Sequence, residues 1–170
     1  MSPLLRDIPD GATVMADANV LVYALTPQAH LHAPCRDLLE RGARGTLAVA
    51  TSVSAAADVL HRAMVLEVLA HGQVQRAAEA VALLKQHPDR VRQLRRYRSI
   101  LHDLRQARVD ILPLTYRDLH ASRQYREQHG LMVNDSLVVA VMQRERIRYL
   151  ATNDADFERI PGIGVWMPAG

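Results

Sequence analysis

Short apolar segments alternate along this chain with longer segments in which apolar residues recur at helical spacing, and this alternation limits the possible folds more than any other feature. The segments with strand character begin at Thr13, Thr46, Val109, Arg148 and Gly164. Strands that are separated by helices usually run parallel, and the connecting helices cover the faces of the sheet. We therefore expect an α/β protein of three layers, with a central, mostly parallel β-sheet flanked by helices on both faces.

The helices are expected between and after these strands, where apolar residues are three or four positions apart. They span residues 34–41, 53–71, 73–86, 90–108, 117–129 and 134–146. The 90–108 helix is amphipathic and rich in arginine, which is typical of a solvated face but also of a platform for RNA phosphates. The chain length fits a single domain, residues 1–170, with a helical extension at about 70–108.

The composition excludes several classes of protein. The 170 residues are 49% hydrophobic, yet no apolar run approaches the about 20 residues of a membrane span. Cys35 is the single cysteine, so no intramolecular disulfide can form, and the first ten residues do not resemble a secretory signal. We expect a cytoplasmic protein. Its net charge of +3, carried almost entirely by arginine, is compatible with a nucleic-acid partner.

Four acidic residues occupy informative places. Asp17 follows the first expected strand and Asp154 the fourth, and chemistry gathers at the carboxyl ends of parallel strands. Asp135 opens a helix, and Asp58 is the only acid in the apolar run 51–66. Crowded carboxylates need a compensating cation, and oxygen ligands without a histidine or cysteine cluster favour Mg²⁺ or Mn²⁺. Such an ion can activate water for attack on a phosphodiester.

Each of these acids also has an interpretation without a metal. Asp17 could cap a turn, and Asp135 could be a helix N-cap. Asp58 could pair with Arg62, one turn further along its helix. Asp154 lies in a turn-rich segment, where Asp is common. The prediction of a metal site therefore depends on four acids fitting one architecture.

Other candidate sites are weaker. His30, His32 and Cys35 have a spacing that resembles soft-metal ligands, but no second pair lies nearby, so we interpret them as scattered surface residues. The sequence contains no Gly-x-Ser-x-Gly motif, no P-loop and no Gly-x-Gly-x-x-Gly motif. These observations leave the four acids as the main candidates.

Three motifs together resemble the PIN domain family, in particular the VapC-type toxins. Residues 15–23 resemble the family's opening motif, an apolar strand that ends in Asp-x-Asn. Residues 133–140 resemble its third acidic motif, and residues 149–157, followed by Ile160-Pro161-Gly162 and Val165, resemble its closing Thr-x-Asp-x-Asp-Phe motif. The resemblance covers essentially the whole chain.

The second motif departs from the family pattern. The family usually has Glu on the helix after the second strand, where this sequence has Asp58, one methylene shorter. The change could be tolerated if a water bridges the ion, or it could weaken metal binding and catalysis. Glu67 is the next acid along the segment, but it lies nine residues later, outside the motif.

The resemblance implies a function and a set of site residues. Asp17, Asp58, Asp135 and Asp154 would converge on one or two divalent ions. Asn19 and Thr152 would support them through hydrogen bonds, and Asp156 would either assist or cap the turn before Phe157. The implied activity is endoribonuclease cleavage of RNA by metal-activated water. The implied partners are RNA, a cognate antitoxin and a second copy of the chain, and no membrane.

Three other functions compete with this one. A PIN-like module with weakened catalysis would bind RNA without cutting it, and a nuclease of the same fold could act in RNA maturation rather than as a toxin. A phosphatase of the haloacid dehalogenase type also begins with Asp after its first strand. That chemistry needs a second Asp as general acid where this chain has Asn19, which cannot donate the proton.

Overall fold

A single five-stranded sheet forms the centre of the computed structural model, which describes residues 3–168. Its order is β3-β2-β1-β4-β5, and every neighbouring pair is parallel. The strands are β1 (Thr13–Ala16), β2 (Ala48–Ser52), β3 (Asp110–Leu112), β4 (Tyr149–Ala151) and β5 (Gly164–Trp166). The predicted α/β fold with a central parallel sheet is confirmed.

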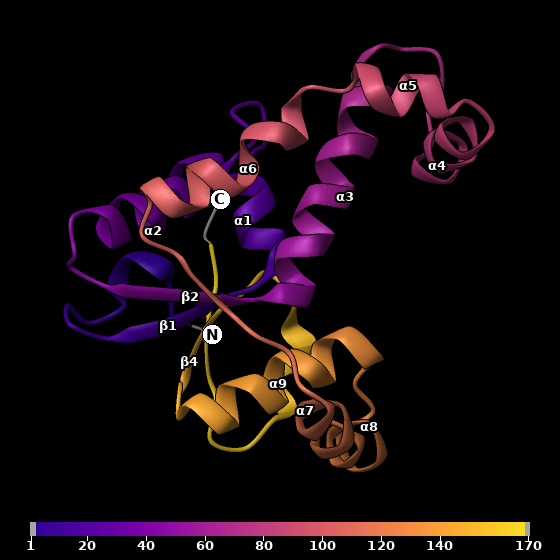
Figure 1. The fold of residues 1–170 in the computed structure, drawn as a ribbon. Helices are drawn as coiled ribbons and strands as arrows, with labels where there is room; N and C mark the ends of the chain where they lie inside the picture. The colour runs from indigo at the N-terminus through magenta and orange to yellow at the C-terminus, as the bar shows by residue number, and fades with distance from the viewer. Residues whose placement is uncertain (1–2, 169–170) are drawn as a thin grey trace.

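Helices cover both faces of this sheet (Figure 1). One face carries α1 (Ala18–Ala24), α2 (His32–Ala43), α3 (Val53–Ala70) and α6 (Arg96–Gln106), and the other carries α7 (Tyr116–Ala121), α8 (Arg123–His129) and α9 (Val133–Glu145). Two 3₁₀ turns, Leu5–Asp7 and Ala155–Arg159, complete these layers. None of the helices within residues 3–168 has the length and apolarity that crossing a membrane requires.

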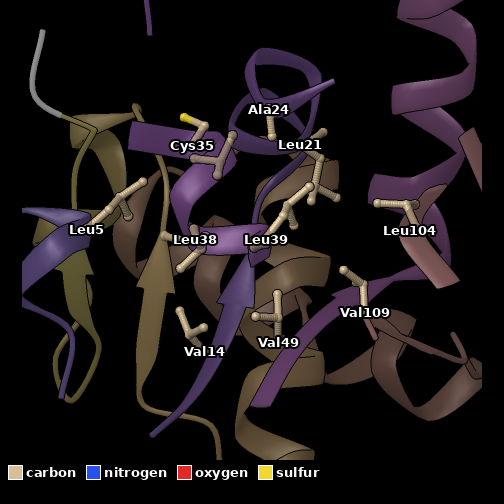
Figure 2. Packing of buried hydrophobic residues seen from close by; sticks show 14 of the residues in the cluster. Leu5, Val14, Leu21, Ala24, Cys35, Leu38, Leu39, Val49, Leu104 and Val109 are labelled. Carbon is tan, nitrogen blue, oxygen red and sulfur yellow. The ribbon is translucent and has the colours of Figure 1, made fainter. Parts of the chain in front are cut away.

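The alternation of side chains along the strands divides the apolar core into two clusters. Val14 and Val49 point to the α1–α2 side, where Leu21, Leu38 and Leu39 cover them (Figure 2). Their chain neighbours Met15 and Ala50 belong to the opposite cluster, together with much of α9. Because each strand contributes to both clusters, the sheet is buried on both faces, as its continuous apolar strands predict.

A third apolar cluster lies away from the sheet. The C-terminal half of α3 packs there against α4 (Ala77–Gln86) and α5 (Pro88–Gln93), through Val65, Ala80 and Leu94. In Figure 1 this group stands at the far end of α3. Since α3 has 18 residues and is therefore about 27 Å long, it reaches beyond the sheet that its first turns cover.

The structure corrects the prediction of one helix over residues 90–108. Two helices, α5 and α6, occupy this range and are separated at Leu94 and Arg95. The Glu67 carboxylate accepts the backbone N–H groups of Arg95, at 3.0 Å, and Arg96, at 2.9 Å, which satisfies the start of α6. Leu94 is buried in the third cluster, whereas Leu104 is buried against the sheet, so the two helices serve different cores.

Three further differences concern helix boundaries. The expected 117–129 helix is divided at Ser122, whose hydroxyl donates to the Leu119 carbonyl at 2.8 Å and accepts from Arg126 at 2.7 Å. The expected 73–86 helix begins only at Ala77. Helix α1 was not predicted, because Asp17-Ala18-Asn19 interrupts the apolar run 13–23 and the four apolar residues that follow are too few to show a helical period.

Candidate active site

The ends of β1 and β4 place Asp17 and Thr152 side by side. These two strands are neighbours, with Ala16 opposite Ala151, and the Asp17 N–H donates to the Ala151 carbonyl at 3.0 Å. Each polar residue follows its strand directly, so the register of the sheet fixes their relative position. The predicted site therefore forms at the carboxyl edge of the sheet, where parallel strands bring their following residues together.

A hydrogen-bond network holds the Asp17 carboxylate. Its Oδ2 accepts from Asn19 Nδ2 at 2.7 Å and from the Thr152 hydroxyl at 2.8 Å, and its Oδ1 accepts from the Ala18 N–H at 2.7 Å. Asn19 also donates to Thr152 Oγ1 at 3.1 Å, and its Oδ1 accepts from the Asn153 N–H at 3.0 Å. We call Asp17, Asn19 and Thr152 the sheet side of the site.

The four predicted acids line one cavity of about 130 Å³ at this edge. Asp17 comes from the end of β1, Asp58 from α3, Asp135 from α9 and Asp154 from the turn after β4. Asn19 also lines the cavity, whereas Thr152 stands behind it and contacts it through Asp17. The structure thus brings together four acids that are far apart in the sequence.

Asp58 and Arg62 form the helix side of the site. They are one turn apart on α3, with Arg62 Nε 2.8 Å from Asp58 Oδ2, and both line the cavity. The ion pair weighed as an alternative interpretation of Asp58 is therefore present. It does not remove Asp58 from the cavity lining, and the charge of Asp58 still helps to raise the pKa of Asp135.

The two remaining acids differ in their local roles. Asp135 lies in the first turn of α9, but the N-cap position belongs to Met132, so Asp135 is not the capping residue. Asp154 accepts the Asp156 N–H at 2.9 Å and so caps the following 3₁₀ turn. The Asp156 carboxylate does not line the cavity and pairs instead with Arg159.

Burial and mutual repulsion dominate the electrostatics of the cavity. Burial, reinforced by the charges of Asp17, Asp154, Asp156 and Asp58, raises the pKa of Asp135 to about 6. Its place in the first turn of α9 would lower the pKa through the helix dipole, but this effect is the smaller one. Burial also raises the pKa of Asp17, against the opposing hydrogen bonds from Thr152 and Ala18.

The donor set fits a hard divalent cation. Every charged ligand candidate in the cavity is a carboxylate, and the raised pKa values mark negative charge that a cation would offset. Within residues 3–168, however, no three His, Cys, Asp or Glu side chains stand close enough together to hold one ion between them. The carboxylates surround the cavity rather than meeting in it, which is the arrangement that their repulsion favours.

Comparison with known proteins identifies the fold. A PIN domain family model matches residues 14–163. The chain belongs to the PIN domain family. Comparison with curated protein sequences gives no match.

Three solved structures are similar to this PIN domain over nearly its whole length. The first contains VapBC2 from Rickettsia felis bound to a promoter DNA fragment, with a TM-score of 0.55 and 20% identity over 91% of this chain and 98% of that chain. The second is VapC20 from Mycobacterium tuberculosis, a sarcin-ricin loop cleaving toxin, with a TM-score of 0.60 and 13% identity over 90% and 98%. The third is a toxin–antitoxin complex from Klebsiella pneumoniae, with a TM-score of 0.53 and 19% identity over 92% and 98%.

Two weaker candidates lie outside the site of this PIN domain. Glu67 is buried at the far half of α3, where it contacts the start of α6, so it cannot take the place of Asp58 in the cavity. His32 Nδ1 lies 3.0 Å from the Tyr23 carbonyl, and burial raises the pKa of the Cys35 thiol to about 12. The interpretation as surface residues is wrong for Cys35, which is fully buried in the apolar core beside α1.

Sequence reasoning missed three polar residues that line the cavity, Ser54, Asn134 and Arg62, although Arg62 was noted as a partner for Asp58. A signal for two of them exists. Ser54, Asp58 and Arg62 are spaced by four residues and so share one face of α3. Asn134 lies next to Asp135, and nothing in its spacing separates it from an ordinary residue of a first helical turn.

Proposed function

We propose that this protein is a divalent-metal-dependent endoribonuclease and the toxin of a toxin–antitoxin pair. The observation that carries the proposal is the presence of four carboxylates, from four separate elements, in the lining of one cavity at the carboxyl edge of a PIN-domain sheet. Membership of the PIN family supports the nuclease activity. The toxin role is supported by similar structures that contain VapBC2, VapC20 and a toxin–antitoxin complex.

The four carboxylates would hold Mg²⁺ or Mn²⁺ during the reaction. When bound, the ion supplies a water of lowered pKa and offsets charge on the phosphodiester. Asp17, Asp58, Asp135 and Asp154 would be its ligands, and Asn19 and Thr152 keep the Asp17 carboxylate in one orientation. Asp156 acts through its backbone, whose N–H orients Asp154.

The partners follow from the same proposal. RNA is the substrate, a cognate antitoxin covers the site, and two copies of the chain form a homodimer in the cytoplasm. The whole chain, 1–170, acts as one PIN-like domain, with residues about 70–108 as a helical extension.

The test is cleavage of a structured RNA pool by purified protein with Mg²⁺, with Mn²⁺ and with EDTA. We expect cutting with either ion and none with the chelator, together with Mn²⁺ binding by titration calorimetry. The Asp17→Asn variant should keep the fold and lose the activity. Equal cutting in EDTA, or full activity of the variant, would contradict the assignment.

A second function has one specific observation in its favour. Because Arg62 already neutralises part of the Asp58 charge, the site could hold an ion too weakly to cut, and the protein would then be an RNA-binding module. Binding of the RNA pool that persists in EDTA, with no cleavage in any metal, would favour that function. A nuclease that is not a toxin can be told apart by expressing the chain alone in cells. Expression should arrest growth only if the protein is a toxin.

A further inference from the structure

Arg62 is the only basic side chain among the described residues that line the acidic cavity. The other charged residues of the lining are Asp17, Asp58, Asp135 and Asp154. A phosphate group that enters this cavity therefore meets four negative charges and one positive charge. A guanidinium is the side-chain group that best matches the geometry of a phosphate, because its planar N–H groups can contact two oxygens at once.

The ion pair with Asp58 holds one edge of this guanidinium. The Nε atom lies 2.8 Å from Asp58 Oδ2, and no hydrogen bond within residues 3–168 engages Nη1 or Nη2. The Arg62 side chain is 49% exposed and the Asp58 side chain 32%. The ion pair thus occupies the Nε edge of the guanidinium and leaves the terminal nitrogens without a hydrogen-bond partner among the described residues.

The charge of Arg62 also reaches across the cavity. Burial raises the pKa of Asp17; the charge of Arg62 opposes this rise, and the charge of Asp154 adds to it. Arg62 on α3 and Asp17 after β1 therefore face the same space. An anion bound there would lie within the field of both.

We propose that Arg62 binds a backbone phosphate of the RNA strand at the cavity, and that Asp58 holds its guanidinium in position. This inference rests on the proposed function and names a substrate contact within the same site. It gives Asp58 two tasks, because Oδ2 faces Arg62 and Oδ1 remains for the cation.

The test measures RNA binding rather than cleavage. A short, fluorescein-labelled single-stranded RNA of random sequence is titrated with full-length protein in Ca²⁺, which takes the same oxygen ligands, over about 50 to 300 mM salt. For Arg62→Gln we expect about tenfold weaker binding at low salt and a salt slope smaller by about 0.7, the value for one lost contact to a single strand. Arg62→Lys should keep the slope but bind more weakly than the wild type.

A matched control separates this contact from a general loss of charge. Arg123 forms the same kind of ion pair with Glu127, four residues later, but it lies on α8 and does not line the cavity. Arg123→Gln removes the same charge. Because Arg123 lies outside the cavity, this variant should keep a low-salt affinity and a salt slope close to those of the wild type. If Arg62→Gln behaves like Arg123→Gln, the proposal is wrong.

A second measurement distinguishes a lost phosphate contact from a damaged site. Mn²⁺ affinity without RNA should be unchanged or slightly tighter in Arg62→Gln, because the variant frees Asp58 and removes a positive charge. Weaker Mn²⁺ binding would mean that Arg62 only supports the carboxylates, which overturns the phosphate role. Wild-type protein that binds RNA but no Mn²⁺ would remove the proposed nuclease and leave the Arg62 contact standing.

Discussion

The two sides of the cavity are built in different ways. On the sheet side, Asp17 accepts three hydrogen bonds from neighbours that the register of β1 and β4 fixes in place. On the helix side, Asp58 has one ion-pair partner, on the half-exposed surface of α3. Exposed ion pairs of this kind contribute little to stability, whereas a network anchored to adjacent strands is held by the fold. We infer that the sheet side is held more firmly than the helix side, where one ion pair holds Asp58 and Arg62 together.

The largest difference is expected between the two Asp→Asn changes. Asp17→Asn should reduce RNA cleavage by about a hundredfold or more, because it removes a carboxylate that the network holds in position. Asp58→Asn should reduce the cleavage rate less, because Arg62 already offsets part of the charge of Asp58. Initial cleavage rates, with circular dichroism as the check on folding, decide the order. A larger loss for Asp58→Asn would reverse the comparison.

Removing a neighbour of Asp17 should have the next largest effect. Thr152→Val keeps the shape of the side chain but removes its hydrogen bonds with Asp17, Asn19 and the Asp154 N–H. We expect about tenfold weaker Mn²⁺ binding by titration calorimetry. Ser54→Ala is the control on the helix side, because Ser54 lines the cavity and, among the described residues, its hydroxyl bonds only to Ser52. Equal losses in the two variants would remove the distinction between the sides.

The pH dependence of stability tests the electrostatics of the cavity. The pKa of Asp135 is raised to about 6 in the folded protein, so the folded state holds this proton more tightly than the unfolded state does. In the presence of a chelator, its contribution to the free energy of unfolding should therefore fall as pH rises from about 4 to about 6. Asp135→Asn should match the wild type near pH 4 and be more stable by about 1 kcal/mol at pH 7, after discounting for solvent screening.

Urea denaturation at several pH values measures this difference, and Mn²⁺ affinity should weaken below a pH of about 6 for the same reason. Asp103→Asn is a suitable control, because Asp103 lies on α6, outside the acidic cavity. A stability difference that is constant with pH would show that the ionisation of Asp135 does not set it.

The smallest effect is expected for the change that restores the family's usual residue. Asp58→Glu lengthens the side chain by one methylene, and the half-exposed surface of α3 leaves room for it. We expect Mn²⁺ binding to tighten by about threefold or less, because the longer carboxylate can approach the ion while it still reaches Arg62. Weaker binding would mean that the spacing of Asp58 and Arg62 is itself a requirement of the site.

The sequence alone determined the class of fold and the place of the acids that follow strands. Short apolar strands alternating with helices specify a parallel sheet, and acids placed directly after strands must meet at its carboxyl edge. Asp17 and Asp154 could be predicted for that reason, and Asp135 and Asp58 through the motifs around them. These inferences work because they use residues that are close together in the sequence.

The tertiary structure decided what distant residues do to one another. The break between α5 and α6 depends on Glu67, whose partner Arg95 lies 28 positions away, and no local pattern reports such a contact. The difference in how Asp17 and Asp58 are held has the same origin. Asp17 accepts a hydrogen bond from Thr152, which follows the neighbouring strand β4. Asp58 pairs with Arg62, which lies on the same helix. Local spacing could therefore suggest the Asp58–Arg62 pair, but only the folded sheet brings it beside the other three acids.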